Sequence, residues 1–224
     1  MSLRFYLDTA DTSEWESWFP TGIFYGVTSN PLLLERAQVP CTIATLTHLT
    51  QKAISLGAKE VQLQTWGNTK QQLIATGQSL ASIDSQVVVK VPITQTGVEA
   101  AARLVAEGIR VTMTVVYEIP QILIAAALGA DYAAPYLGRI NDTGRNGREN
   151  LTKMQQALNG VNSKTRILTA SIREPEDIVY LATQGLNTFT FAPHIAAALL
   201  SSPATSSATA AFEAAVAKMS TTDI

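Results

Sequence analysis

Short apolar runs rich in β-branched residues alternate with helical stretches from one end of the chain to the other. Each apolar run has the length of a single strand. We predict strands at residues 4–8, 25–30, 60–66, 86–91, 110–116, 131–137, 166–171 and 188–192. Helices are predicted at residues 12–19, from 31, 42–56, 68–81, 97–107, 120–128, 149–158, 174–184 and from 194. The chain therefore repeats a strand–helix unit.

Eight such units, without an antiparallel hairpin signal between them, predict a (β/α)8 TIM barrel, an α/β fold, as one domain over residues 1–224. An open, doubly wound sheet is the alternative, but no G-x-G-x-x-G loop follows the first strand. One more helical segment, at 208–219, has no strand partner. It lies in a C-terminal stretch, 205–224, which we expect to form a lid or to pack as an arm on a neighbouring subunit.

Side chains of a barrel strand alternate between the barrel axis and the helices, and functional groups gather at the C-terminal strand ends. The residues expected to point inward come two apart: Tyr6 and Asp8, Gln62 and Gln64, Val88 and Lys90, Thr112 and Thr114, Ala134 and Tyr136, Thr169 and Ser171. Their neighbours are apolar and are expected to face the helices: Leu63, Val89, Val91, Met113, Val115 and Pro135. Thr28 and Asn30 finish the second strand. We therefore expect polar groups from most strands to meet at one rim, around Lys90.

The stretch VVVKVPIT, residues 87–94, places Lys90 in the middle of the fourth predicted strand. Lysine is rarely buried because an ammonium group loses its hydration outside water. Burial lowers the pKa of a lysine, and a neutral amine can attack a ketone to form a Schiff base. The alternative is a structural lysine that pairs with Asp8 or extends to the barrel mouth. We favour catalysis because many hydroxyl and amide groups are expected around Lys90, whereas an ion pair needs only one partner.

The segment LGRINDTGRNGREN, residues 137–150, is predicted to be a loop that carries Arg139, Arg145 and Arg148 ahead of a helix. Backbone N–H groups, a helix N-terminus and guanidinium groups together suit a phosphate. A solvated surface loop is the alternative. Arg139 is the best candidate because it lies nearest the strand end, and Ser171 with Arg173 adds a polar and basic pair at the neighbouring rim position.

Composition excludes several classes of protein. Apolar residues make up 46% and charged residues 15% of the chain, whose net charge is −2, so we expect neither a nucleic-acid nor a membrane partner. Cys41 is the single cysteine, and a strand begins almost at once, so we expect a cytoplasmic protein without a signal peptide. His48 and His194 lie far apart, and we expect no metal and no cofactor.

Five motifs, FYLDTAD, GVTSNP, VVVKVPIT, AAPYLGRI and TASIR, resemble in order and spacing those of the transaldolase family of class I aldolases. The resemblance covers nearly the whole chain and is closest to the small, single-domain branch that includes fructose-6-phosphate aldolase. It implies a (β/α)8 barrel with Lys90 as the Schiff-base lysine, and pentamers or decamers in which the last helix reaches a neighbour. The other site residues that it implies are Asp8, Thr28 and Asn30 around the donor hydroxyls and Arg139 and Ser171 around the phosphate.

Two positions bear on the subtype that the resemblance implies. Transaldolases carry a glutamate where this chain has Gln64, which would act with Thr114 through a bound water. Transaldolases usually carry phenylalanine at the position of Tyr136, whereas the aldolase members carry a tyrosine there. An amide cannot take up a proton as a carboxylate can, whereas a phenol can supply one. Leu32 and Trp66 depart from the family pattern.

We therefore predict a Schiff-base aldolase of the pentose phosphate pathway that forms or cleaves fructose 6-phosphate from dihydroxyacetone and glyceraldehyde 3-phosphate. Its catalytic residues would be Lys90, Asp8, Tyr136, Gln64 and Thr114; its substrate-binding residues would be Thr28, Asn30, Arg139, Ser171 and Arg173. The alternative is a transaldolase that transfers a dihydroxyacetone unit to erythrose 4-phosphate. Two rivals are a non-catalytic barrel that binds sugar phosphates and a metal-dependent isomerase.

Overall fold

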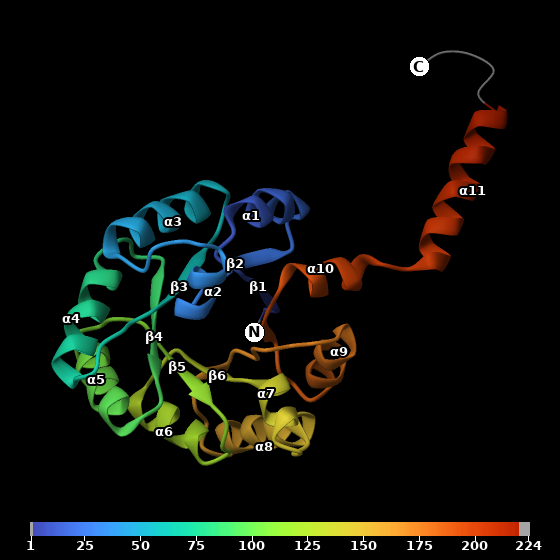
Figure 1. Ribbon diagram of the computed structural model, residues 1–224. Coiled ribbons are helices and arrows are strands. Elements are labelled where there is room, and N and C mark those ends of the chain that lie inside the picture. Colours follow the sequence, from blue (N-terminus) through green and yellow to red (C-terminus); the bar gives the residue numbers. More distant parts are fainter. Residues whose placement is uncertain (1, 220–224) are drawn as a thin grey trace.

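The computed structural model describes residues 2–219 and has one sheet of eight parallel strands ringed by helices (Figure 1). The strands are β1 (Arg4–Asp8), β2 (Phe24–Thr28), β3 (Glu60–Gln64), β4 (Val87–Pro92), β5 (Val111–Val116), β6 (Tyr132–Pro135), β7 (Arg166–Ile167) and β8 (Thr188–Phe191). The helices between them are α1 (Thr12–Trp18), the 3-10 helix η1 (Phe19–Thr21), α2 (Pro31–Arg36), α3 (Ile43–Ser55), α4 (Lys70–Ala81), α5 (Gln95–Ala106), α6 (Gln121–Leu128), α7 (Leu137–Asp142), α8 (Gly147–Gly160), α9 (Pro175–Thr183) and α10 (Pro193–Leu200). A final helix, α11, spans Pro203–Met219.

The sheet closes on itself between β8 and the segment that follows β7. Strand order runs β7-β6-β5-β4-β3-β2-β1-β8, and the two ends meet where Thr169 pairs with Phe189. The Thr169 N–H donates to the Thr188 carbonyl at 3.0 Å, and the Thr190 N–H donates to the Thr169 carbonyl at 2.9 Å. The fold is therefore the predicted (β/α)8 barrel and not an open, doubly wound sheet.

Two separate apolar clusters confirm the predicted alternation of side chains in the middle strands. Leu63, Val89 and Val91 are buried in the large core between sheet and helices. Val88 and Ala134 belong instead to a smaller cluster inside the barrel, with Tyr6, Tyr132 and Leu168. Because strand residues alternate between faces, this arrangement points Lys90 towards the barrel axis.

The predicted orientation is wrong at Val115. The β5–β6 pairing is irregular between Met113 and Val116, and Val115 has a left-handed backbone with φ of 63°. Val115 consequently lines the cavity at the C-terminal end of the barrel, while Val116 takes the buried position against the helices. A β-branched residue rarely adopts such a φ, and an irregularity of this kind redirects side chains.

Two further expectations on the second half of the chain also need correction. Thr169 pairs with Phe189 of the helix-facing core, and Leu168 lies inside the barrel, so the alternation after β7 is shifted by one residue from the prediction. The segment predicted as a loop over 137–150 contains the helix α7, which lies across the barrel end just after β6. Its first two N–H groups are bonded within the fold: Leu137 donates to the Ala170 carbonyl and Gly138 to the Ser171 carbonyl, each at 2.9 Å.

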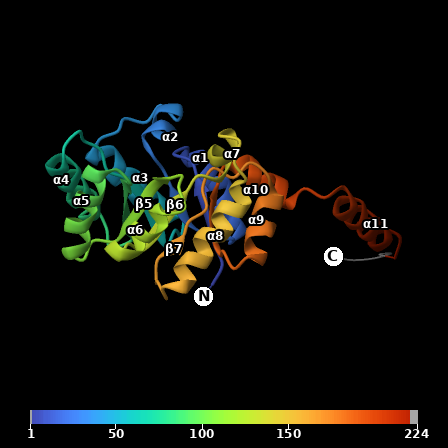
Figure 2. The ribbon, with the colours of Figure 1, turned by 90° about the horizontal axis from the view of Figure 1, so that it is seen from below.

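The helix α11 extends away from the barrel (Figures 1 and 2). It begins earlier than predicted, at Pro203, and none of its residues is buried. Phe212 and Val216 are among its exposed apolar side chains. Its packing on a neighbouring subunit stays a prediction. Within residues 2–219, no helix combines the length and the apolar character that crossing a membrane requires.

Candidate active site

A cavity of about 440 Å³ opens at the C-terminal ends of the strands. Seven of the predicted site residues line it: Asp8, Asn30, Gln64, Lys90, Tyr136, Arg139 and Ser171. Figure 2 shows α2 and α7, which contribute lining residues, at this end of the barrel and the N-terminus at the opposite end. Two predicted residues, Thr28 and Thr114, are fully buried and bond to residues of the lining.

Lys90 is almost completely buried, with 4% of its surface exposed. Its Nζ donates a hydrogen bond to the Ser29 carbonyl at 2.9 Å. Burial lowers the pKa of Lys90, and the nearby charge of Asp8 opposes this effect without reversing it. The amine is therefore held by a neutral acceptor at the cavity wall, in surroundings that favour its uncharged form.

The Asp8 carboxylate is oriented by hydroxyl groups. Thr28 Oγ1 donates to Asp8 Oδ1 at 2.6 Å, and Thr28 Oγ1 and Thr190 Oγ1 are also 2.6 Å apart. These residues come from β1, β2 and β8, which are neighbours in the barrel. Asp8 thus remains available to the cavity as a fixed acceptor, and Thr190 is a site residue that the sequence did not reveal.

Tyr136 lines the same cavity as Lys90. Its hydroxyl forms a hydrogen bond of 2.9 Å with Thr114 Oγ1, and its ring packs against Tyr117 with the centroids 5.8 Å apart. Burial raises the pKa of Tyr136, although the Thr114 hydrogen bond acts in the opposite direction. The phenol is therefore protonated near neutral pH and can both donate and accept a hydrogen bond.

Gln64 stands beside Lys90 in the sheet. The two residues are direct partners in the β3–β4 register, and both line the cavity. Asn30 lies at the start of α2, where its Oδ1 accepts from the N–H groups of Leu32 and Leu33 at 3.0 and 3.1 Å. Because this oxygen is committed to the cap, the amide nitrogen of Asn30 is the group left to contact a ligand.

Arg139 and Ser171 both line the cavity. Ser171 has a left-handed backbone with φ of 58°, which turns the chain after β7 towards α7. Gly138 allows this approach, since a Cβ there would lie 2.6 Å from the Ser171 carbonyl oxygen. The fold thus brings the Arg139 guanidinium and the Ser171 hydroxyl to the same cavity.

Arg173 is not among the residues that line the cavity. Its Nη1 and Nη2 donate to the two carboxylate oxygens of Asp142 at 2.7 and 2.6 Å. This bidentate pair fixes the side chain on the surface. A contact of Arg173 with substrate stays a prediction.

The lining residues that the sequence did not predict include three with chemically distinctive side chains: Arg36, Tyr117 and Phe191. Tyr117 directly follows β5, so its place after a strand end was a usable signal. Arg36 ends the short helix α2, and nothing in the sequence connected it with the site. In the part of the chain from 2 to 219, no three His, Cys, Asp or Glu side chains are grouped to hold a metal ion.

Comparisons with known proteins agree with this geometry. The family described as "Transaldolase/Fructose-6-phosphate aldolase" matches residues 5–224. A "Probable transaldolase" of Lactiplantibacillus plantarum is 31% identical over 212 residues, 94% of each chain, and one of Thermus thermophilus is 33% identical over 208 residues, 91% of this chain and 93% of the relative. A solved flavocytochrome b2 variant has a TM-score of 0.60 at 11% identity, with 86% of this chain and 56% of that chain covered. This last likeness supports the barrel fold alone.

Proposed function

Since the chain belongs to the transaldolase/fructose-6-phosphate aldolase family, we propose that it is a class I aldolase acting on fructose 6-phosphate. The observation that carries the proposal is the state of Lys90. Its amine is buried at the wall of the cavity, bonded to a neutral carbonyl, and has a lowered pKa. A neutral amine at the wall of a polar cavity is the nucleophile that Schiff-base chemistry requires.

The reaction would begin when the Lys90 nitrogen adds to the C2 ketone of the sugar and water is lost. The resulting cationic imine accepts the electron pair of the C3–C4 bond as that bond breaks. The C4 hydroxyl gives up its proton, C4 becomes the aldehyde of glyceraldehyde 3-phosphate, and an enamine remains on Lys90. Protonation of the enamine carbon and hydrolysis of the imine would release dihydroxyacetone and restore the amine.

Tyr136 would act as the general acid–base that moves the C4 hydroxyl proton. The C4 proton would pass to a water bonded to Tyr136, Gln64 and Thr114 and would return to the enamine carbon. The supporting contacts are the Tyr136–Thr114 hydrogen bond and the place of Gln64 next to Lys90. General acid–base groups of this kind contribute about 100-fold or more to a rate.

The remaining polar groups would position the substrate. Asp8, held by Thr28, would accept from a donor hydroxyl, and the amide nitrogen of Asn30 would donate to another. Arg139 and Ser171 would bind the phosphate, because a guanidinium and a hydroxyl match its oxygens in charge and geometry.

A second candidate is transaldolase activity, which the names of the relatives favour. Both activities share every step up to the enamine. In a transaldolase the enamine would attack erythrose 4-phosphate instead of being protonated. Gln64 and Tyr136 are our reasons for placing the aldolase outcome first.

The test incubates the protein with fructose 6-phosphate, with and without erythrose 4-phosphate, and measures dihydroxyacetone and glyceraldehyde 3-phosphate. An aldolase releases both products without the acceptor. A transaldolase releases glyceraldehyde 3-phosphate only when the acceptor is present. A non-catalytic binding barrel releases neither, and an isomerase that needs a metal loses its activity in a chelator. Lys90→Met is the matched blank.

Three further expectations belong to the proposal. The protein would assemble as a pentamer or decamer in which α11 packs on a neighbour; the full exposure of that helix is the supporting observation. It would work in the cytoplasm, in the pentose phosphate pathway. It would need no cofactor, since the lysine itself supplies the electron sink.

A further inference from the structure

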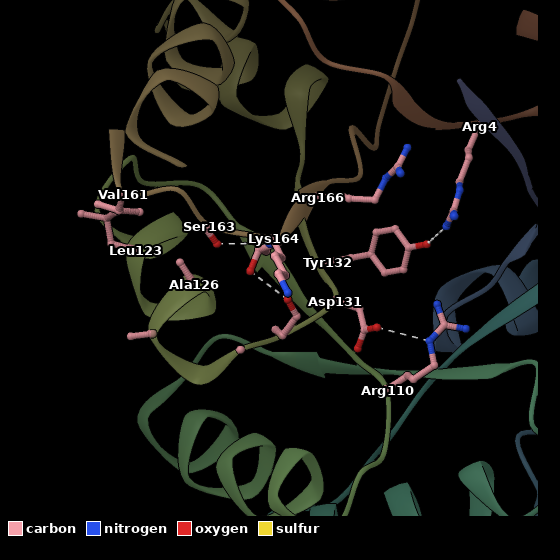
Figure 3. A pocket seen from close by; sticks show the side chains of 14 residues that line it. Arg4, Arg110, Leu123, Ala126, Asp131, Tyr132, Val161, Ser163, Lys164 and Arg166 are labelled. Atoms are coloured by element: carbon pink, nitrogen blue, oxygen red, sulfur yellow. Dashed lines mark hydrogen bonds and ion pairs between the residues drawn. The ribbon is translucent and has the colours of Figure 1, made fainter. Parts of the chain in front are cut away.

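A second and larger cavity, of about 890 Å³, lies at the N-terminal ends of the barrel strands (Figure 3). Arg4 begins β1, Arg110 precedes β5, Tyr132 begins β6 and Arg166 begins β7, so the cavity is at the opposite end of the barrel from Lys90. The mechanism proposed for Lys90 uses none of its residues.

The inner wall of this cavity is positively charged. Arg4, Arg110, Lys164 and Arg166 line it, together with Asp131, and buried Glu60 lies directly behind. Four cations and two carboxylates leave a local charge of +2, in a chain whose total charge is −2. A concentration of positive charge in a concave site of an acidic protein indicates an anionic ligand.

The two carboxylates are already engaged with other groups. Glu60 accepts from Arg4, Arg110, Tyr6 and Tyr132, and Asp131 accepts from Arg110 at 3.2 Å and from the Val111 N–H at 3.1 Å. They therefore neutralise Arg4 and Arg110, and the excess charge resides on the other two cations.

Arg166 is held in this cavity by neutral acceptors. Its Nε donates to Thr188 Oγ1 at 3.0 Å, and its Nη2 donates to the Ser2 carbonyl and to Asn187 Oδ1, each at 2.8 Å. All of these acceptors are neutral. Burial and the charge of Arg4 lower the pKa of Arg166. Among residues 2–219 the guanidinium has no carboxylate partner and Nη1 has no acceptor, so the fixed cation keeps the two N–H groups of Nη1 for a ligand.

The outer wall is apolar. Leu123, Ala126 and Ala127 of α6 and Val161 after α8 form it. Figure 3 shows Leu123, Ala126 and Val161 on one side of the cavity and the arginines on the other, with Lys164 between them. The cavity therefore has a charged inner end and an apolar outer end.

We propose that this cavity binds an organic phosphate monoester whose substituent is apolar or aromatic. The phosphate, with a charge of about −1.5 to −2 at neutral pH, matches the local charge of +2 and would accept from Arg166 and Lys164. The apolar substituent would lie against α6. Inorganic phosphate and neutral aromatic compounds would each use only half of the site.

The test is calorimetric titration with phenyl phosphate in low-salt buffer. We expect saturable binding by the wild type and equal binding by Arg139→Gln, which removes the guanidinium proposed to bind phosphate in the other cavity. Arg166→Gln should weaken binding about tenfold or more, since it removes a charge-assisted hydrogen bond. Lys164→Glu should weaken binding as well. Because Lys164 is exposed, this change should not disturb folding, so it distinguishes loss of the site from misfolding of the Arg166 variant. Inorganic phosphate and benzyl alcohol should bind at least about tenfold more weakly than phenyl phosphate.

Hydrogen exchange locates the ligand on the chain. With phenyl phosphate present, we expect slower exchange in residues 126–132 and 161–166, and unchanged exchange in residues 28–36. The proposal is overturned if the wild type does not bind, if Arg139→Gln abolishes binding while Arg166→Gln and Lys164→Glu leave it intact, or if inorganic phosphate binds as tightly as phenyl phosphate.

Discussion

Glu60 and Lys90 are buried at opposite ends of the barrel interior, and their surroundings differ. Glu60, at the N-terminal end, is 2% exposed and bonds to two arginines and two tyrosines. Lys90, at the C-terminal end, is 4% exposed and bonds to one backbone carbonyl. A buried charge that is fully paired keeps its charge, whereas an unpaired one shifts its pKa towards the neutral form. The first arrangement stabilises the fold, and the second makes a reactive group.

Lys90→Met should have the largest effect on activity. Removing the amine should lower fructose 6-phosphate cleavage by about a thousandfold or more, because no imine can form. The same change should leave the free energy of unfolding equal or higher, because methionine fills the site without a buried polar group. Activity assays and urea unfolding measure the two effects. Lys59→Met, on the surface, is the control; a destabilised Lys90→Met protein would contradict the comparison.

Glu60→Gln should lower stability and leave activity nearly unchanged, the reverse of Lys90→Met. It removes the carboxylate charge that Arg4 and Arg110 share, while Arg110 keeps its ion pair with Asp131, and we expect a loss of about 3 kcal/mol of unfolding free energy. Activity of the folded protein should change less than a few-fold because Glu60 lies away from the Lys90 cavity. Glu118→Gln removes an exposed ion pair with Arg145 and should cost less than about 1 kcal/mol. Equal losses in the two variants would show that burial of Glu60 does not matter.

Tyr136→Phe tests which group of the C-terminal cavity is the general acid–base. It removes the hydroxyl that bonds to Thr114 and should lower kcat for cleavage by about 100-fold, with borohydride trapping of the imine retained. Tyr117→Phe changes the neighbouring tyrosine of the same cavity and should lower kcat only a few-fold. If both variants are equally active, the acid–base role belongs to another group.

The pH dependence of stability gives the smallest effect. Burial lowers the pKa of Lys90 in the folded state, while the unfolded chain has the ordinary value of about 10.4. Between these two pKa values the unfolded state binds one more proton, so the unfolding free energy should rise with pH. Lys90→Met should remove this rise. Urea unfolding at a series of alkaline pH values measures this. If the unfolding free energy of the wild type and of Lys90→Met changed equally with pH, the pKa of Lys90 would not be lowered.

Much of the barrel was predictable because its rules are local. Strand alternation placed Lys90 and its apolar neighbours Val89 and Val91 on opposite faces, and the structure agrees. The polar residues at strand ends then had to meet, because parallel strands end at the same rim.

The errors came from tertiary constraints. Val115 turns into the cavity because β5 and β6 pair irregularly, and a left-handed valine has no sequence signature. β7 has only two residues, so its alternation could not be carried forward to Thr169. Glu60 was not singled out from the sequence, because its partners Arg4, Arg110 and Tyr132 are far from it along the chain.

Schiff-base formation at Lys90 is tested by borohydride reduction in the presence of fructose 6-phosphate, followed by mass spectrometry of the peptides. We expect a single reduced adduct on Lys90, formed only with substrate and absent from Lys90→Met. Unmodified Lys90 under conditions of full turnover, or an adduct that forms on another lysine, would contradict it.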